Sequence, residues 1–228
     1  MKNLTEKISQ EDIMKVLDAC YNKCLEGKGK AIPSVNKMAD DYLSKEPDVE
    51  KAVKTMQKYQ IAKCTTSGFI NGFGGLIAMP VTIPANVGSV LYVQMRMIAC
   101  TAKMAGYELD NDQVQTLVYA CLAGISVNEI FKGIGIKFGE KLALSAIKKI
   151  PGEVCFKIYQ KVGFRLLTKF GEKGLINLGK MIPGVGAIIN GGLDLTETKI
   201  IADRAYKMFF NGIAQIDDDV EVELEISK

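Results

Sequence analysis

The chain has 228 residues and a formal net charge of +3, from 29 basic and 26 acidic side chains, and it contains no histidine. The absence of histidine excludes Ser-His and Cys-His nucleophile pairs and histidine-ligated metals. The six cysteines are scattered through apolar segments, which is typical of reduced, buried thiols rather than of a disulfide scaffold. We therefore expect a cytoplasmic protein. Residues 1–17 carry charges and lack an apolar stretch, so we expect no signal peptide there.

The N-terminal part of the chain predicts three helices. The first shows apolar residues at helical spacing and is ended by Gly27 and Gly29, because glycine readily takes the left-handed conformation that closes a helix. The second begins at Pro33, whose fixed backbone angle suits a first helical turn, and the third begins at Pro47. We expect residues 1–46 to form N-terminal helices that pack on a helical domain spanning residues 47–212.

Residues 64–95 contain no charged side chain. They read CTTSGFINGFGGLIAMPVTIPANVGSVLYVQM, and prolines divide them into pieces too short to cross a bilayer comfortably, since a span needs about 20 apolar residues. Closely spaced glycines let helix backbones approach each other, in lipid and in tight cores alike. We interpret the segment as an apolar helical hairpin, either buried in the core or inserted shallowly in a membrane, whose marker positions are Gly68, Gly72, Gly75, Pro80 and Pro84.

Two further helices follow this segment. Apolar residues at helical spacing predict a helix after Pro84 that stops at Gly106. Asp110 and Asp112 then favour a new helix N-terminus by capping and by their interaction with the helix dipole, and we expect that helix over residues 112–131. No convincing strand pattern appears before the C-terminal tail. The sequence therefore predicts an all-α fold, as a single compact multi-helix domain.

The middle of the chain is strongly basic. Between Lys132 and Lys180 eleven basic residues face three acidic ones, on two amphipathic helices separated by Pro151 and Gly152. A phenylalanine within a basic face is typical of a helix that lies in a membrane interface, although a solvated lysine face would look the same. No nucleic-acid motif accompanies these charges, and we expect no nucleic-acid partner. The candidate lipid-binding residues are Lys137, Lys141, Lys148, Lys157, Lys161, Phe164, Arg165 and Lys169.

Several polar residues lie within apolar helical segments, and the candidate site residues among them are Asn86, Asp194 and Thr198. Because a buried polar group without a hydrogen bond costs about 1–3 kcal/mol, we expect them either to pair helices or to line a cavity for a head group or a small ligand. The sequence shows no recognisable catalytic constellation, and we predict neither a metal nor a cofactor. Residues 213–228 form an acidic tail that we expect to be disordered.

Two segments carry a resemblance to a known family. Residues 66–112, TSGFINGFGGLIAMPVTIPANVGSVLYVQMRMIACTAKMAGYELDND, combine a glycine-rich apolar helix, a proline-containing break, a helix ending in a basic position and an acidic turn. Residues 182–205, IPGVGAIINGGLDLTETKIIADRA, add a closing glycine-rich helix. Together they resemble the EcsC-like family over roughly residues 45–212. The resemblance implies an all-helical, mainly bacterial protein with no established enzymatic activity and no defined catalytic residues.

These patterns lead to a hypothesis of function. We expect a non-enzymatic helical protein, peripherally associated with membranes, that binds anionic lipids through its basic face and its apolar hairpin. One alternative is a soluble helical domain that binds an apolar small ligand in its core. Another alternative is an adaptor for a membrane transporter complex, with an integral membrane protein as its partner. The sequence does not indicate an oligomeric state.

Overall fold

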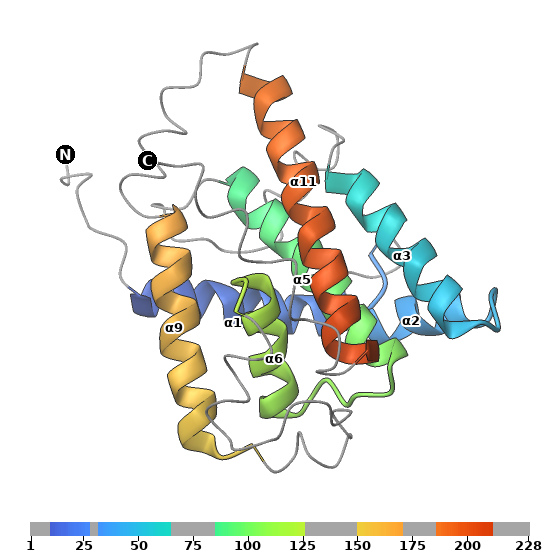
Figure 1. Ribbon diagram of the computed structural model, residues 1–228, viewed down its shortest axis with the longest axis horizontal. Coiled ribbons are helices and arrows are strands. Elements are labelled where there is room, and N and C mark those ends of the chain that lie inside the picture. Colours follow the sequence, from blue (N-terminus) through green and yellow to red (C-terminus); the bar gives the residue numbers. More distant parts are fainter. Residues whose placement is uncertain (1–9, 28–31, 65–84, 126–149, 171–185, 212–228) are drawn as a thin grey trace.

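The computed structural model describes residues 10–27, 32–64, 85–125, 150–170 and 186–211 (Figure 1). Within these ranges the chain forms seven α-helices and one short π-helix, with no strand, and the all-α prediction is confirmed. The elements are α1 (Gln10–Glu26), α2 (Val35–Leu43), α3 (Val49–Cys64), α5 (Ala85–Met104), α6 (Asp112–Leu122), α9 (Gly152–Phe170), α11 (Gly186–Tyr206) and the π-helix η1 (Lys207–Asn211).

Helix α5 lies at the centre of the fold and contacts α1, α2, α3, α6 and α11. Every residue from 91 to 102 is buried, which explains why the sequence there has almost no charge. Residues 91–95, the described end of the predicted apolar hairpin, therefore belong to the protein core. The glycine and proline positions of that hairpin, from Gly68 to Pro84, lie outside the described residues, as does the acidic tail.

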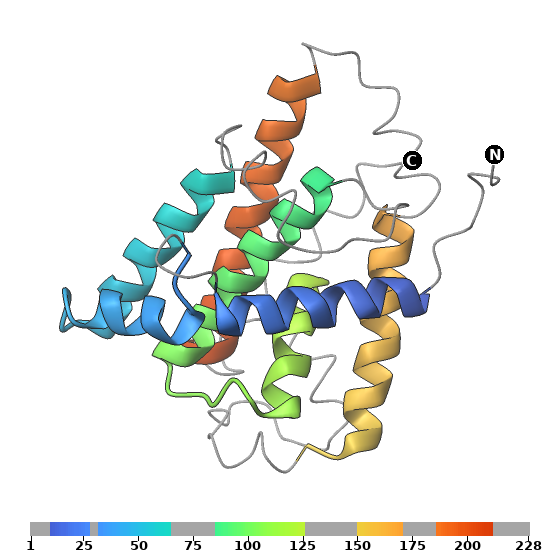
Figure 2. The ribbon, with the colours of Figure 1, turned by 180° about the vertical axis from the view of Figure 1, so that it is seen from behind.

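The helices on either side of α5 form two ends of the molecule. Helix α9 packs on α1 and α6. Helices α2 and α3 lie at the other end of the longest axis, and α1 runs between the two ends (Figures 1 and 2). Helix α11 contacts α3, α5 and α6, and its Ile201 and Ala205 are buried as their spacing predicts. No helix in the described part of the chain combines the length and apolarity needed to span a membrane.

Local interactions explain where the helices begin. Ser34, rather than Pro33, caps α2, and its Oγ accepts a hydrogen bond from the backbone N–H of Lys37 at 3.1 Å. Asn111, rather than either neighbouring aspartate, caps α6 by accepting from two backbone N–H groups. In both cases the side chain that reaches the first free backbone donors sets the boundary.

The predicted helix over residues 112–131 is too long. Helix α6 ends at Leu122, and Gly124 follows it with a φ of +73°. The N–H of Ile125 then bonds to the carbonyl of Ala120 at 2.9 Å, which closes the helix as glycine commonly does. The first helix ends in the same way at Gly27, where φ is +71°, and the predicted end is confirmed.

Candidate functional site

The exposed face of α9 brings together some of the residues that the sequence singles out. Pro151 precedes the helix, and its carbonyl accepts hydrogen bonds from the backbone N–H groups of Val154 and Cys155. Ile158 and Val162 are buried against the rest of the fold. On the other side of the helix, two lysines and two phenylalanines are exposed to solvent, namely Phe156, Lys157, Lys161 and Phe164.

A hydrogen-bonded cluster fixes which face of α9 points outward. The Tyr159 hydroxyl donates to the Asp18 carboxylate on α1, and the Tyr119 hydroxyl of α6 donates to the same oxygen at 2.8 Å. Gln115 donates to it as well, at 3.2 Å. The rings of Tyr119 and Tyr159 lie 5.4 Å apart, and burial raises the pKa of both phenols, so they remain protonated donors at neutral pH. The cluster holds Tyr159 inward and the phenylalanines outward.

Two aromatic side chains on this face are largely exposed to solvent. The side chains of Phe156 and Phe164 are 63% and 61% exposed, and they are the most exposed large hydrophobic residues in the described part of the chain. Isolated apolar residues on a surface need no explanation, but two phenylalanines on one helix face form a patch of the kind that marks a contact site. We call Phe156, Lys157, Lys161 and Phe164 the α9 face.

The sequence predicted three of these four residues, since Lys157, Lys161 and Phe164 lie on the exposed side as expected. Phe156 was missed, although the apolar stripe through Ile158 and Val162 leaves it on the opposite side of the helix at 100° per residue. The backbone of Arg165 and Lys169 also lies in α9, but their side chains are outside the described set. Three predicted lysines lie wholly outside the described residues, namely Lys137, Lys141 and Lys148.

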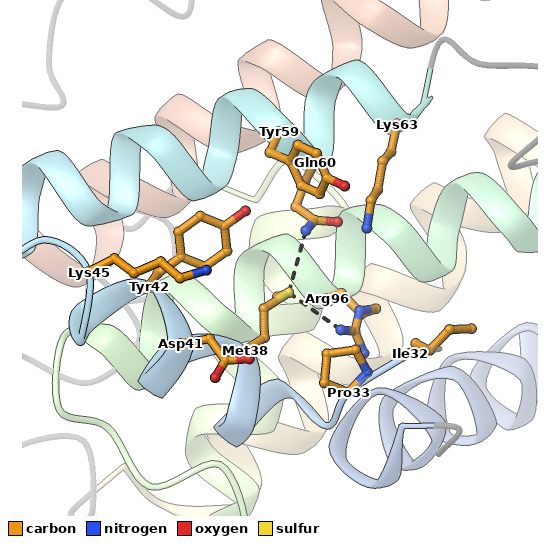
Figure 3. Close-up of a pocket in the computed structure, with 10 residues that line it drawn as sticks. All are labelled: Ile32, Pro33, Met38, Asp41, Tyr42, Lys45, Tyr59, Gln60, Lys63 and Arg96. Carbon is orange, nitrogen blue, oxygen red and sulfur yellow. Dashed lines mark hydrogen bonds between the residues drawn. The ribbon is translucent and has the colours of Figure 1, made fainter. Parts of the chain in front are cut away.

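A second candidate site is a pocket between α2, α3 and α5, at the far end of the molecule from α9 (Figures 1 and 3). Its volume is about 300 Å³, which lies at the lower end of the range for small-molecule sites. Ile32 and Pro33, which precede α2, form one part of its wall. The other lining residues are Met38, Asp41, Tyr42, Lys45, Tyr59, Gln60, Lys63 and Arg96.

Arg96 lies at the inner end of this pocket and is only 5% exposed. One guanidinium nitrogen donates to the Tyr92 hydroxyl at 3.5 Å, and the other donates to the Met38 sulfur at 3.4 Å (Figure 3). The guanidinium carbon is 5.7 Å from the centre of the Tyr92 ring. None of these partners is an anion. The carboxylate that lines the pocket, Asp41, forms its ion pair with Lys37 instead, at 2.9 Å.

Lys63 adds a second positive charge to the pocket. Its amine lies 4.6 Å from the centre of the Tyr59 ring, and Figure 3 shows it directed from α3 toward Arg96. Burial lowers the pKa of Lys63, and the nearby positive charge of Arg96 lowers it further. The pocket therefore brings together two cationic groups, Arg96 and Lys63, whose charges disfavour each other, and Lys45 is a third cation in its lining.

The sequence contains one signal for this pocket. Arg96 is the single charged residue between Lys63 and Lys103. A charge in the middle of a long apolar helix must either reach the surface or have a buried role. Sequence reasoning used Arg96 only as the end of the uncharged run and did not identify it as a site residue.

The buried polar residues that the structure describes pair helices. Thr198 is fully buried, and its Oγ1 accepts a hydrogen bond from Gln94 Nε2 at 3.0 Å, which joins α11 to α5. Gln57 on α3 donates to the Ala202 carbonyl at 2.9 Å and to Thr101 Oγ1 at 3.3 Å. This hydrogen bond is of the kind that the helix-pairing interpretation of Thr198 expects. The side chains of Asn86 and Asp194 are outside the described set, although their backbones lie in α5 and α11.

The described cysteines show no reactive arrangement. The five cysteines whose side chains are described are free thiols, and four of them are buried while Cys155 is partly buried. Burial raises the pKa of Cys20, Cys100 and Cys121 to about 12, so these thiols are protonated at neutral pH. Within the described ranges no group of acidic or cysteine side chains could hold a metal ion.

The chain matches no protein-family model, no curated protein and no solved structure. Its resemblance to the EcsC-like family therefore stays a prediction from sequence. The α9 face and the pocket around Arg96 are the two candidate sites of the described chain.

Proposed function

We propose that this protein associates peripherally with membranes and binds anionic lipid surfaces through the α9 face. The observation that carries the proposal is the exposure of Phe156 and Phe164 beside Lys157 and Lys161 on one side of one helix. A helix that lies in a membrane interface presents this combination, with aromatic side chains entering the acyl boundary and lysines at the level of the head groups.

The expected strength of this association is moderate. Transfer of a phenylalanine side chain from water to an apolar environment is worth about 1.5–3 kcal/mol when it is complete. Each lysine near an anionic surface contributes about 1 kcal/mol. Two residues of each kind give a gross gain of roughly 5–8 kcal/mol, from which the entropic cost of association must be subtracted. The binding should therefore be reversible and sensitive to salt, because the Debye length is about 8 Å at physiological ionic strength.

Vesicle flotation tests the proposal with the full chain. The protein should float with phosphatidylcholine vesicles that contain phosphatidylserine, and it should float much less with phosphatidylcholine alone. Two double variants remove one contribution each. The variant Lys157→Glu, Lys161→Glu removes the electrostatic attraction, and the variant Phe156→Ser, Phe164→Ser removes the apolar insertion. Both should lose most of the flotation while the helical circular dichroism signal is retained.

A matched control for the lysine variant makes the same change in net charge on a different part of the surface. Lys58 on α3 and Lys199 on α11 are exposed, and their double replacement by glutamate should leave flotation close to that of the unmodified protein. Equal losses in the α9 variant and in this control would mean that net charge alone attracts the protein. Unchanged flotation of the Phe156→Ser, Phe164→Ser variant would contradict insertion of the α9 face.

A further inference from the structure

We propose that the pocket between α2, α3 and α5 binds a small organic oxyanion, a phosphate or carboxylate group on a compact apolar body, with Arg96 as its counter-ion. This inference does not depend on membrane binding by the α9 face. Helix α9 lies at one end of the longest axis of the molecule, whereas α2 and α3, which line the pocket, lie at the other end (Figures 1 and 2), and the two sites share no residue.

The first argument is the state of Arg96. A guanidinium group has five N–H donors and a permanent positive charge. The Arg96 residue is only 5% exposed, and its guanidinium donates hydrogen bonds to a thioether sulfur and a phenol. Buried charges in proteins are normally paired, because removal of an ion from water is costly. An oxyanion in the pocket would supply the missing partner, and arginine is the side chain best suited to hold one with two parallel hydrogen bonds.

The second argument is that other donors face the same space. Gln60 is nearly fully buried, and its amide nitrogen donates to the same Met38 sulfur at 3.4 Å (Figure 3). Sulfur in a thioether is a weak acceptor, so Gln60 and Arg96 both have donors that a stronger acceptor could engage. The Lys63 amine is directed toward Arg96 from the other side. An anion between Arg96 and Lys63 would also remove the repulsion that lowers the pKa of Lys63.

The third argument concerns the rest of the ligand. Beyond the cationic groups, the lining includes the apolar or aromatic side chains of Ile32, Pro33 and Tyr42 beside the polar Asp41 and Gln60. A cavity of about 300 Å³ is larger than a bare phosphate ion needs and small for a drug-sized molecule. The lining therefore fits an anion that carries a compact apolar or aromatic group. The Asp41 carboxylate does not oppose such a ligand strongly, because Lys37 neutralises it.

Isothermal titration calorimetry on the full chain tests the proposal with defined probes. Phenyl phosphate and benzoate should bind, and inorganic phosphate should bind at least tenfold more weakly than phenyl phosphate because it lacks the apolar body. Dihexanoyl phosphatidic acid, below its micellar concentration, presents the same phosphate on a lipid. Tighter binding of this lipid than of phenyl phosphate would identify a lipid head group as the source of the ligand, and the reverse order would identify a soluble anion.

The decisive variant is Arg96→Met, which replaces the buried charge with an apolar side chain of similar length. It should weaken phenyl phosphate binding at least tenfold and should melt at or above the temperature of the unmodified protein. A purely structural arginine would instead give a lower melting temperature and no change in affinity. The matched control is Arg204→Met on α11, which lies outside the pocket and should keep the full affinity.

Three results would overturn the proposal. The first is the absence of calorimetric binding for both phenyl phosphate and benzoate. The second is an unchanged affinity in Arg96→Met. The third applies if circular dichroism shows that Arg96→Met does not fold. Lys63→Met, at a partly buried position on α3, is then the test variant, and an unchanged affinity in that variant overturns the proposal.

Discussion

Replacement of Gly27 by alanine should destabilise the protein strongly. Gly27 has a φ of +71°, and an added Cβ would lie 2.5 Å from the Ile32 carbonyl oxygen and 2.5 Å from the Ser34 nitrogen. Both are backbone atoms, so no side chain can rotate away to relieve the overlap. The left-handed conformation costs a residue with a Cβ about 1–2 kcal/mol. Overpacking adds typically about 1–3 kcal/mol, and the free energy of unfolding should therefore fall by about 2–5 kcal/mol.

Gly124 provides the matched control, because its φ of +73° is almost the same. A Cβ at this position would approach only the end of the Arg204 side chain, with Nη1 at 3.3 Å. That flexible group can move by the small amount required. Gly124→Ala should therefore cost only the conformational part, about 1–2 kcal/mol. The difference between the two variants isolates the collision with the backbone at Gly27.

Urea and thermal unfolding followed by circular dichroism measure both free energies. For a chain of this length, 1 kcal/mol corresponds to a shift in melting temperature of about 2–4 °C. Gly27→Ala should also weaken phenyl phosphate binding, because the added Cβ would push against the backbone of Ile32 and Pro33, which line the pocket. Equal destabilisation by the two alanine variants would show that the close approach at Gly27 does not exist and would refute the reasoning.

Three further predictions concern buried groups. Arg96→Met should raise the free energy of unfolding in the absence of ligand, by up to about 4 kcal/mol, and a lower melting temperature would mean that the guanidinium is well compensated. Thr198→Val should lower the free energy of unfolding by about 1–3 kcal/mol, because it leaves the buried Gln94 amide without its acceptor. When Gln94→Leu is added, the double variant should recover part of this loss in the same unfolding experiment. Burial raises the pKa of Cys100 and Cys121 from 9.0 to about 12, so both thiols stay protonated in the folded protein at a pH where they ionise in the unfolded chain. The free energy of unfolding should therefore fall as the pH rises from 9 toward 12. At pH 8, alkylation of these thiols, measured by mass spectrometry, should be slow until urea unfolds the chain.

The sequence predicts the helices well where an apolar stripe and a stop signal agree. Helix α5 follows Pro84 and ends just before Gly106, whose φ is +89°, and α1 ends at Gly27. The prediction failed for the end of α6, because the residues beyond Leu122 remain apolar and periodic while the conformation of Gly124 closes the helix. A glycine inside a periodic segment is ambiguous from sequence, since a helix tolerates it at a cost of about 1 kcal/mol.

The two candidate sites differ in how far the sequence could reveal them. The α9 face lies on one helix, so a single helical period places its lysines and phenylalanines together. The pocket is lined by residues between 32 and 96 that lie on three helices and in the segments next to them. No pattern within a single helix predicts that these residues lie close together in space. Arg96 was visible as a lone charge in an apolar helix, but its partners became apparent only when Met38 and Tyr92 were placed beside it.

Helix α1 lies between the two sites and takes part in the support of both. Its Asp18 accepts the hydroxyl hydrogen bond of Tyr159, which orients α9. One turn and a half farther along, the Lys23 carbonyl accepts a hydrogen bond from Tyr92, whose hydroxyl in turn accepts one from Arg96. Each site is thus anchored to a different part of one rigid helix, and no residue is shared between them. Distant positions without a common partner contribute almost additively, so membrane flotation and calorimetric anion binding report on separate surfaces, and failure of either proposal leaves the other standing.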